Sequence, residues 1–120
     1  MKILIIDDDR IYLSALEMRY EKLPNVTICQ CNSTKSALEA ITKHQPEAVL
    51  LDNSLSGSGS SNGLEVARSL RSNPETVGIN LYSISAALTR QDENAYRELG
   101  VEIVGKSPER IFPMIDQLAS

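Results

Sequence analysis

Short, mostly apolar runs alternate along this chain with segments in which apolar residues recur every three or four positions. The apolar runs lie at residues 2–7, 26–31, 48–51, 79–84 and 101–104. Runs of this length, rich in Val, Ile and Leu, are typical of strands that are buried on both faces of a parallel sheet. The pattern therefore predicts five strands.

Helical spacing of apolar residues fills the intervening segments. It predicts helices over residues 11–23, 33–45, 64–72 and 89–99, and a last one that carries residues 111–118. Ser33 or Thr34 is the expected N-cap of the second helix, and Gly100 the C-terminal cap of the fourth. Pro113 is expected at an early position of the last helix, because deeper inside it would remove a backbone hydrogen bond.

This alternation predicts an α/β fold, a doubly wound five-stranded parallel sheet with helices on both faces. Right-handed crossovers place the C-terminal ends of all strands at the same edge of the sheet, where ligands bind in such folds. The length of 120 residues fits one domain over residues 1–120, with a single core.

Acidic residues gather at the predicted edge. Asp7, Asp8 and Asp9 follow the first strand, and Asp52 ends the third. Asp9 is interpreted as the N-cap of the next helix. Crowded carboxylates repel one another unless a divalent cation lies among them. The sequence therefore predicts a Mg2+ site beside an aspartate that can be phosphorylated.

Two further strand ends bring polar groups to the same edge. Ser83 and Ser85 lie at the end of the fourth strand, and Lys106 follows the fifth. Taken singly, Ser85 is explained as an ordinary serine in a turn, and Lys106 as a charged side chain exposed to solvent. Compatible chemistry at four strand ends favours a functional site.

Over essentially its whole length, the chain resembles the receiver domains of two-component response regulators. The matching segments are Ile-Leu-Ile-Ile-Asp-Asp-Asp, Val-Leu-Leu-Asp, Gly-Leu-Glu-Val-Ala, Ser-Ile-Ser-Ala and Gly-Lys-Ser-Pro, in this order. The resemblance implies the flavodoxin-like receiver fold, Mg2+ as cofactor, and a histidine kinase or phosphotransfer protein as phosphoryl donor. It also implies that the domain catalyses its own phosphorylation and slow dephosphorylation, while acting mainly as a switch.

The resemblance assigns a metal site and a nucleophile. Asp52 would take the phosphoryl group and contact the metal. Asp8 would bind Mg2+ directly and Asp7 through water, and the backbone carbonyl of Ser54 would complete the protein ligands. Hard oxygen ligands of this kind suit Mg2+.

Two more residues would contact the phosphoryl group. Lys106 would pair with it as a mobile positive charge, and a serine hydroxyl would donate a hydrogen bond to it. Ser85 is preferred to Ser83 for this role because Ala86, a small residue as in the family, follows it. Its distance from Gly100 also matches the usual helix length.

Three departures from the family stand out. The Ser/Gly-rich loop at 54–63 is longer than usual and lacks the usual proline, with Ser56 in its place. Lys106 precedes Ser107, so we expect either a trans bond there or a cis bond shifted to Ser107–Pro108. The fifth strand lacks the usual aromatic, which puts the usual aromatic rotamer switch in doubt; its nearest counterparts are Ile103 and Val104.

Two other classes of function are kept as alternatives. A phosphorylation-independent adaptor with the receiver fold agrees with the altered lysine turn and the missing aromatic, but the chemical residues are all present. A phosphatase of the haloacid-dehalogenase type requires Asp-x-Asp after the first strand. Residues 7–9 fit that spacing, but the rest of that family's pattern is not evident.

Charge and composition limit the partners. The net charge of -4, with scattered Lys and Arg, lacks the basic footprint of a nucleic-acid-binding protein. No run is long enough to span a membrane, and acidic residues arrive too early for a signal peptide, so a cytoplasmic location is expected. The sequence leaves open the cognate kinase, the output partner and whether the chain forms a homodimer.

Cys29 and Cys31 lie two residues apart on a predicted strand, where their side chains point to the same face. A disulfide across such neighbours has poor geometry, and the only histidine, His44, is remote. Both cysteines are therefore interpreted as small buried hydrophobic residues.

Overall fold

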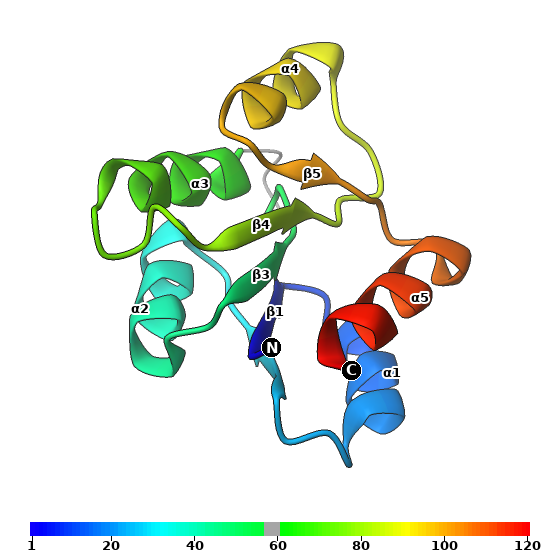
Figure 1. Ribbon diagram of the computed structural model, residues 1–120. Coiled ribbons are helices and arrows are strands. Elements are labelled where there is room, and N and C mark those ends of the chain that lie inside the picture. Colours follow the sequence, from blue (N-terminus) through cyan, green and yellow to red (C-terminus); the bar gives the residue numbers. More distant parts are fainter. Residues whose placement is uncertain (57–60) are drawn as a thin grey trace.

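The computed structural model describes residues 1–56 and 61–120. Within them, five parallel strands form one sheet in the order β2-β1-β3-β4-β5, and a helix follows each strand (Figure 1). The strands are β1 (Ile3–Asp7), β2 (Val26–Gln30), β3 (Ala48–Leu51), β4 (Asn80–Ser83) and β5 (Glu102–Ile103). The helices are α1 (Arg10–Tyr20), α2 (Thr34–His44), α3 (Asn62–Ser72), α4 (Arg90–Glu98) and α5 (Pro108–Ala119). The predicted doubly wound α/β fold is confirmed.

The register of the sheet aligns the C-terminal ends of the strands. Ile6 of β1 lies opposite Leu51 of β3, and Leu51 lies opposite Ser83 of β4. Ser83 in turn lies opposite Ile103 of β5. The residues that follow these four positions therefore emerge side by side at one edge.

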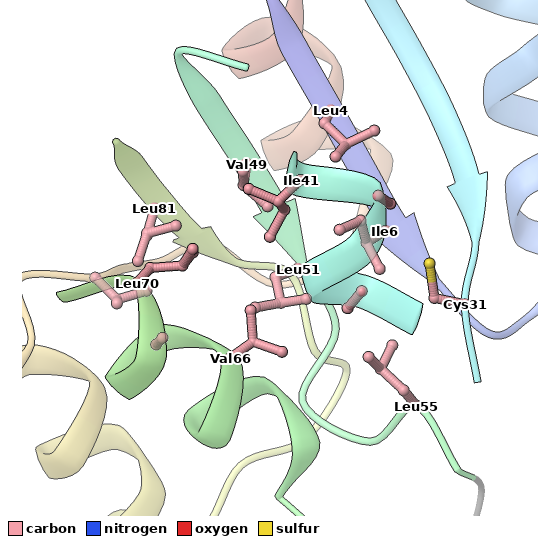
Figure 2. Packing of buried hydrophobic residues seen from close by; sticks show 14 of the residues in the cluster. Leu4, Ile6, Cys31, Ile41, Val49, Leu51, Leu55, Val66, Leu70 and Leu81 are labelled. Atoms are coloured by element: carbon pink, nitrogen blue, oxygen red, sulfur yellow. The ribbon is translucent and has the colours of Figure 1, made fainter. Parts of the chain in front are cut away.

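Helices cover both faces of the sheet. A core between the sheet and α2, α3 and α4 contains Leu4, Ile6, Val49, Leu51 and Leu81 from the strands (Figure 2). The opposite core, under α1 and α5, contains Ile3, Ile5 and Leu50 from the alternate strand positions. Burial on both faces explains why these strands are apolar throughout instead of alternating.

Side-chain caps begin three of the helices. Asp9, Ser33 and Thr89 each accept a hydrogen bond from a backbone N–H in the first turn of α1, α2 and α4. Ser33, and not Thr34, is thus the cap of α2. Gly100 has a φ of 70° just after α4, the left-handed conformation expected of a C-terminal cap.

Among the described helices, none is long and apolar enough to cross a membrane.

Pro113 was expected near the start of the last helix, and that prediction is wrong. Helix α5 begins at Pro108, and Pro113 lies inside it. Pro113 lacks the N–H that would bond to the Glu109 carbonyl. Its side chain is exposed, so water can reach this part of the helix and hydrate that carbonyl.

Several boundaries also differ from the sequence prediction. Helix α1 ends at Tyr20, three residues before the predicted end, and α3 begins at Asn62 instead of Leu64. Strand β5, at one edge of the sheet, is two residues long and therefore shorter than predicted. Residues 57–60 of the predicted Ser/Gly loop lie outside the described residues.

Both cysteines carry free thiols, with their Sγ atoms 3.7 Å apart. Cys31 is buried, and Cys29 is half-buried against the same core. Burial, followed by the nearby Cys29, raises the pKa of the Cys31 thiol to about 12, so this thiol is protonated at neutral pH. The cysteines therefore act as small core side chains, as expected from the sequence.

Candidate functional site

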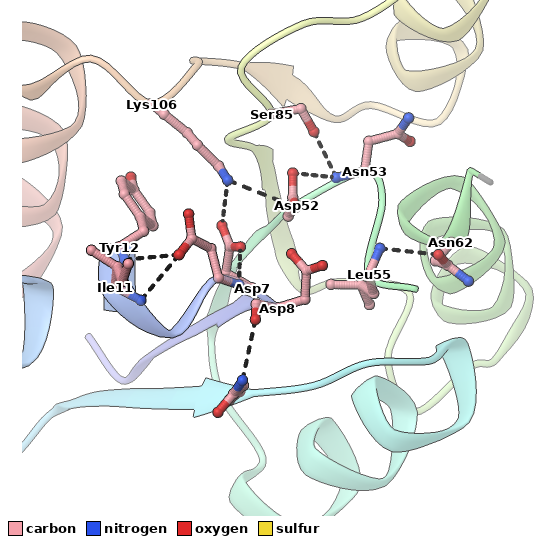
Figure 3. A network of polar contacts seen from close by, with 12 residues as sticks. Asp7, Asp8, Ile11, Tyr12, Asp52, Asn53, Leu55, Asn62, Ser85 and Lys106 are labelled. Carbon is pink, nitrogen blue, oxygen red and sulfur yellow. Dashed lines mark hydrogen bonds and ion pairs between the residues drawn. The ribbon is translucent and has the colours of Figure 1, made fainter. Parts of the chain in front are cut away.

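The sheet edge brings together the side chains that the sequence singled out. Asp7 ends β1 and Asp8 follows it, while Asp52 comes directly after β3. Ser85 follows β4 by two residues, and Lys106 lies in the turn between β5 and α5. Figure 3 shows these five side chains converging on one small region.

Three carboxylates form the acidic centre of the site. One oxygen each from Asp7, Asp8 and Asp52 lie within 4.8 Å of one another. Asp7 is fully buried and Asp52 is 7% exposed. Burial and then the nearby Asp7 raise the pKa of both Asp8 and Asp52. Such a group of hard oxygens in mutual repulsion could hold a divalent cation.

Lys106 supplies the positive charge of the site. Its Nζ lies 2.8 Å from Asp7 Oδ2 and 3.7 Å from Asp52 Oδ2. It also lies 4.8 Å from the centre of the Tyr12 ring, a cation–π contact. Burial lowers the pKa of Lys106, but the bond to Asp7 and the charge of Asp52 outweigh it and raise the net pKa. The ammonium group therefore stays charged and only partly neutralises the three carboxylates.

Ser85 lies beside Asp52. The backbone N–H of Asn53 donates to Asp52 Oδ1 at 2.9 Å and to Ser85 Oγ at 2.6 Å. Ser83, the other candidate, lies inside the sheet, where its hydroxyl is a neighbour of Tyr96. Ser85 therefore lies next to the Asp52 carboxylate, while Ser83 contacts Tyr96.

Hydrogen bonds to Asn62 hold the loop after Asp52 where it leaves the site. Asn62, the first residue of α3, accepts hydrogen bonds at Oδ1 from the backbone N–H groups of Leu55 (3.0 Å) and Ser56 (3.1 Å). Leu55 is fully buried and Ser54 is half-buried. The backbone on either side of the Ser54 carbonyl is therefore held in place.

The structure describes two of the three departures from the family pattern, the turn at Lys106 and the missing aromatic of β5. The peptide bonds before Ser107 and Pro108 are both trans, so Lys106 reaches the site without a cis bond. Ile103 is half-buried and Val104 is buried where the family usually has an aromatic.

Sequence reasoning missed several residues that build the site. Asn53 and Asn62 hold the backbone around Asp52, and Tyr12 faces Lys106. Two signals could have found the asparagines. Asn53 is an amide next to the predicted nucleophile, two residues after a buried strand, and Asn62 precedes the glycine that begins the Gly-Leu-Glu-Val-Ala segment. Tyr12 carries no comparable signal, because its packing depends on a residue 94 positions later.

The geometry agrees with the comparison with protein families. The family model for the response regulator receiver domain matches residues 3–108. The chain belongs to the response regulator receiver domain family. This receiver domain is therefore part of a two-component system, in which a histidine kinase or phosphotransfer protein is the expected partner class. No curated protein matches the chain significantly in sequence.

Solved structures share the fold. A DNA-binding response regulator of the LuxR family from Staphylococcus aureus is 20% identical, with a TM-score of 0.76 and full coverage of both chains. The signal receiver domain of the DNA-binding response regulator merR from Colwellia psychrerythraea 34H is 24% identical, with a TM-score of 0.74 over 97% of this chain and 92% of that one. The BeF3-activated N-terminal receiver domain of Klebsiella pneumoniae RstA is 18% identical, with a TM-score of 0.72 over 98% and 95%.

Proposed function

We propose that this receiver domain accepts a phosphoryl group on Asp52 and signals through altered contacts with other proteins. The observation that carries the proposal is the meeting of three carboxylates with one ammonium group. Asp7, Asp8 and Asp52 offer oxygens within 4.8 Å of one another, with Lys106 Nζ against two of these residues. Membership of the receiver family supports a histidine kinase or phosphotransfer protein as the phosphoryl donor.

The donor set fits Mg2+. Asp8 is half-buried and would bind the ion directly, with Asp52 and the Ser54 carbonyl as the other protein ligands and Asp7 acting through water. These are hard oxygen ligands, and the raised pKa of Asp8 reflects burial and repulsion by Asp7, which a cation would relieve. When bound, Mg2+ neutralises negative charge on the phosphoryl and carboxylate oxygens.

The chain's own residues then position the reaction. A carboxylate oxygen of Asp52 forms the new bond to phosphorus, and the bond from phosphorus to the donor's nitrogen or oxygen breaks, leaving its electron pair on the donor. Ser85 donates its hydroxyl hydrogen to a phosphoryl oxygen, and Lys106 pairs with another. Attack by water on phosphorus reverses the modification, releasing inorganic phosphate and restoring the Asp52 carboxylate.

The output is proposed to be a change in protein contacts made by the single domain formed by residues 1–120. The phosphoryl group would bias the domain between two conformations, and the face made by α4, β5 and α5 would carry the difference to a partner. The proposed partners include a second copy of the domain, in a homodimer that forms on phosphorylation.

Intact-protein mass spectrometry after incubation with acetyl phosphate and Mg2+ tests the proposal. The expected result is a single phosphoryl adduct on the wild type. The adduct should be absent from Asp52→Asn, which removes the nucleophile but keeps the shape, and from wild type treated with a chelator. Ser83→Ala serves as a matched control for Ser85→Ala, because only Ser85 lies beside Asp52.

The alternative of a phosphorylation-independent adaptor receives no support from the family comparison. The same experiment separates the two functions. A wild-type chain that forms no adduct, and shows no heat of Mg2+ binding in calorimetry, would contradict the phosphoacceptor role and leave the adaptor.

A further inference from the structure

Helix α4 reaches the phosphoacceptor turn through one buried side chain. Of the nine residues of α4, all of them described, only Tyr96 is buried, at 1% exposure. Its hydroxyl donates a hydrogen bond of 2.6 Å to Oδ1 of Asn53, the residue that directly follows Asp52. A buried tyrosine hydroxyl needs such a partner, so this contact fixes where the ring lies.

A second residue of α4 holds the other end of the same amide. Asn53 Nδ2 donates to Asp92 Oδ2 at 3.3 Å, and Asp92 lies one helical turn before Tyr96. The amide oxygen thus accepts from a tyrosine that donates, and the amide nitrogen donates to a carboxylate that accepts. Both polar ends of the Asn53 side chain are therefore bonded to α4.

The backbone of Asn53 is bonded to the reacting groups. Its N–H lies between Asp52 Oδ1 and Ser85 Oγ, at 2.9 and 2.6 Å. Because Ser85 Oγ accepts this bond, its own hydrogen is available to the Asp52 carboxylate, and this hydrogen bond favours the charged form of Asp52. Asn53 therefore orients the hydroxyl that the proposed function requires, and does so from the residue next to the nucleophile.

Helix α3 packs against the backbone of Asn53 at Gly63. The backbone N–H of Gly63 donates to the Asn53 carbonyl at 2.8 Å. A Cβ added at Gly63 would lie 2.7 Å from the Asp52 carbonyl oxygen and would also clash with the Tyr96 hydroxyl. The close approach leaves little room for Asn53 to move without moving its neighbours.

We propose that Asn53 is a positioning residue, and that its bond to Tyr96 conveys the state of Asp52 to α4. This inference rests on the proposed function. A phosphoryl group brings strong acceptor oxygens that compete for the Asn53 N–H and the Ser85 hydroxyl. Any shift of Asn53 is passed through its bonded side chain to Tyr96 and Asp92. The link connects the site to α4 in a chain whose β5 lacks the usual aromatic.

The test uses amide nitrogen–proton NMR spectra with beryllofluoride and Mg2+ as a stable substitute for the phosphoryl group. BeF3 activates the structurally similar RstA receiver domain. In the wild type, we expect the amide signals of Asn53, Ser85 and α4 to shift. In Tyr96→Phe, the signals of Asn53 and Ser85 should still shift, while the shifts in α4 fall to about half or less, because the shorter of the two bonds between the Asn53 side chain and α4 is lost and only the bond to Asp92 remains.

Tyr82→Phe is the matched control. It removes one tyrosine hydroxyl from β4, where Tyr82 packs in the core under α1 and α5, away from α4. We expect it to respond like the wild type. Shifts in α4 of wild-type size in Tyr96→Phe would overturn the inference while leaving the phosphoacceptor role intact. A wild type in which neither Asn53 nor Ser85 responds would overturn the proposed function and the inference together.

Asn53→Ala is a second variant that breaks the contact between Asn53 and α4. It decides the test if Tyr96→Phe does not fold. It removes the side-chain bonds to Tyr96 and Asp92 but keeps the backbone N–H beside Asp52. We expect the same loss of shifts in α4, and a change of about threefold or more in the lifetime of the phosphoryl group on Asp52. A purely structural role would lower the melting temperature without changing that lifetime, and this result would overturn the positioning role.

Discussion

At the scale of single residues, Asp52 has neighbours with opposing effects. Burial and the Asp7 carboxylate disfavour its charge, while Lys106 favours it, and the net result is a raised pKa. A carboxyl group with a raised pKa stabilises the fold while it is protonated. That contribution is fully present below the pKa of the unfolded chain, about 3.9, and is lost as the pH rises through the folded pKa.

The Asp52→Asn variant is therefore expected to be more stable than the metal-free wild type at neutral pH. The gain should be on the order of 1 kcal/mol in the free energy of unfolding, because the amide has the shape of the carboxylate without its charge. Urea unfolding in the presence of a chelator measures it.

The pH dependence is the control for this prediction. Near pH 3, below the pKa of the unfolded chain, the Asp52 carboxyl group of the wild type and the amide of the variant are both neutral. The difference in the free energy of unfolding should then largely disappear. Addition of Mg2+ at neutral pH should stabilise the wild type more than the variant. A variant that is less stable than the wild type at neutral pH without metal would contradict this account.

At the scale of secondary-structure elements, the packing of α3 against the site depends on Gly63. Gly63→Ala is expected to lower the free energy of unfolding by roughly 1–3 kcal/mol, since the added methyl group overlaps the Asp52 carbonyl oxygen. Thermal and urea unfolding provide the measurement. The methyl group meets the Tyr96 side chain as well as the Asp52 backbone, so a side-chain rotation cannot relieve the whole clash.

Gly78→Ala is the matched control for the same substitution. Nothing lies within 4 Å of a Cβ added at Gly78, and the residue is exposed in the turn before β4. Its effect on stability should stay within about 0.5 kcal/mol. Equal effects of the two substitutions would show that α3 does not pack as closely as described.

The elements and the edge of the site were predictable because they depend on local patterns. Apolar runs located β1 to β5, and the rule that strand ends share one edge placed Asp52 near Lys106, 54 positions away. The bond between Asn53 and Tyr96 was not predictable. It depends on the depth at which α4 packs, which no local spacing encodes. Pro113 was misplaced because the prediction used only the local cost of a proline inside a helix, and the rest of the sequence around it still forms α5.

At the scale of the whole molecule, Arg71 joins three separate segments. From the last turn of α3, its guanidinium donates to four carbonyls, those of Val77 (2.8 Å), Ile79 (2.7 Å), Leu99 (2.7 Å) and Gly100 (3.4 Å). These carbonyls belong to the segment before β4 and to the end of α4. One side chain therefore satisfies backbone groups that would otherwise lie unpaired where α3, β4 and α4 meet.

Arg71→Met is expected to lower the free energy of unfolding by about 2–4 kcal/mol, because methionine keeps the apolar stem but leaves four carbonyls without this donor. Arg68→Met, at an exposed position of the same helix, controls for loss of charge and should change stability by less than about 0.5 kcal/mol. Urea unfolding of both variants measures the difference. Similar values for the two would contradict the joining role of Arg71.

The position of β1 has a consequence for how the chain is made. Strand β1 is translated before the other four strands of the sheet and lies between β2 and β3, so both of its neighbours are synthesised after it. Asp7 and Asp8 exist as residues long before Lys106, the last of the converging groups, is translated. Chemistry that needs all of these groups therefore starts only after the receiver domain has been translated as far as Lys106. A histidine kinase that requires all of these groups therefore cannot phosphorylate a chain that has been translated only as far as β4.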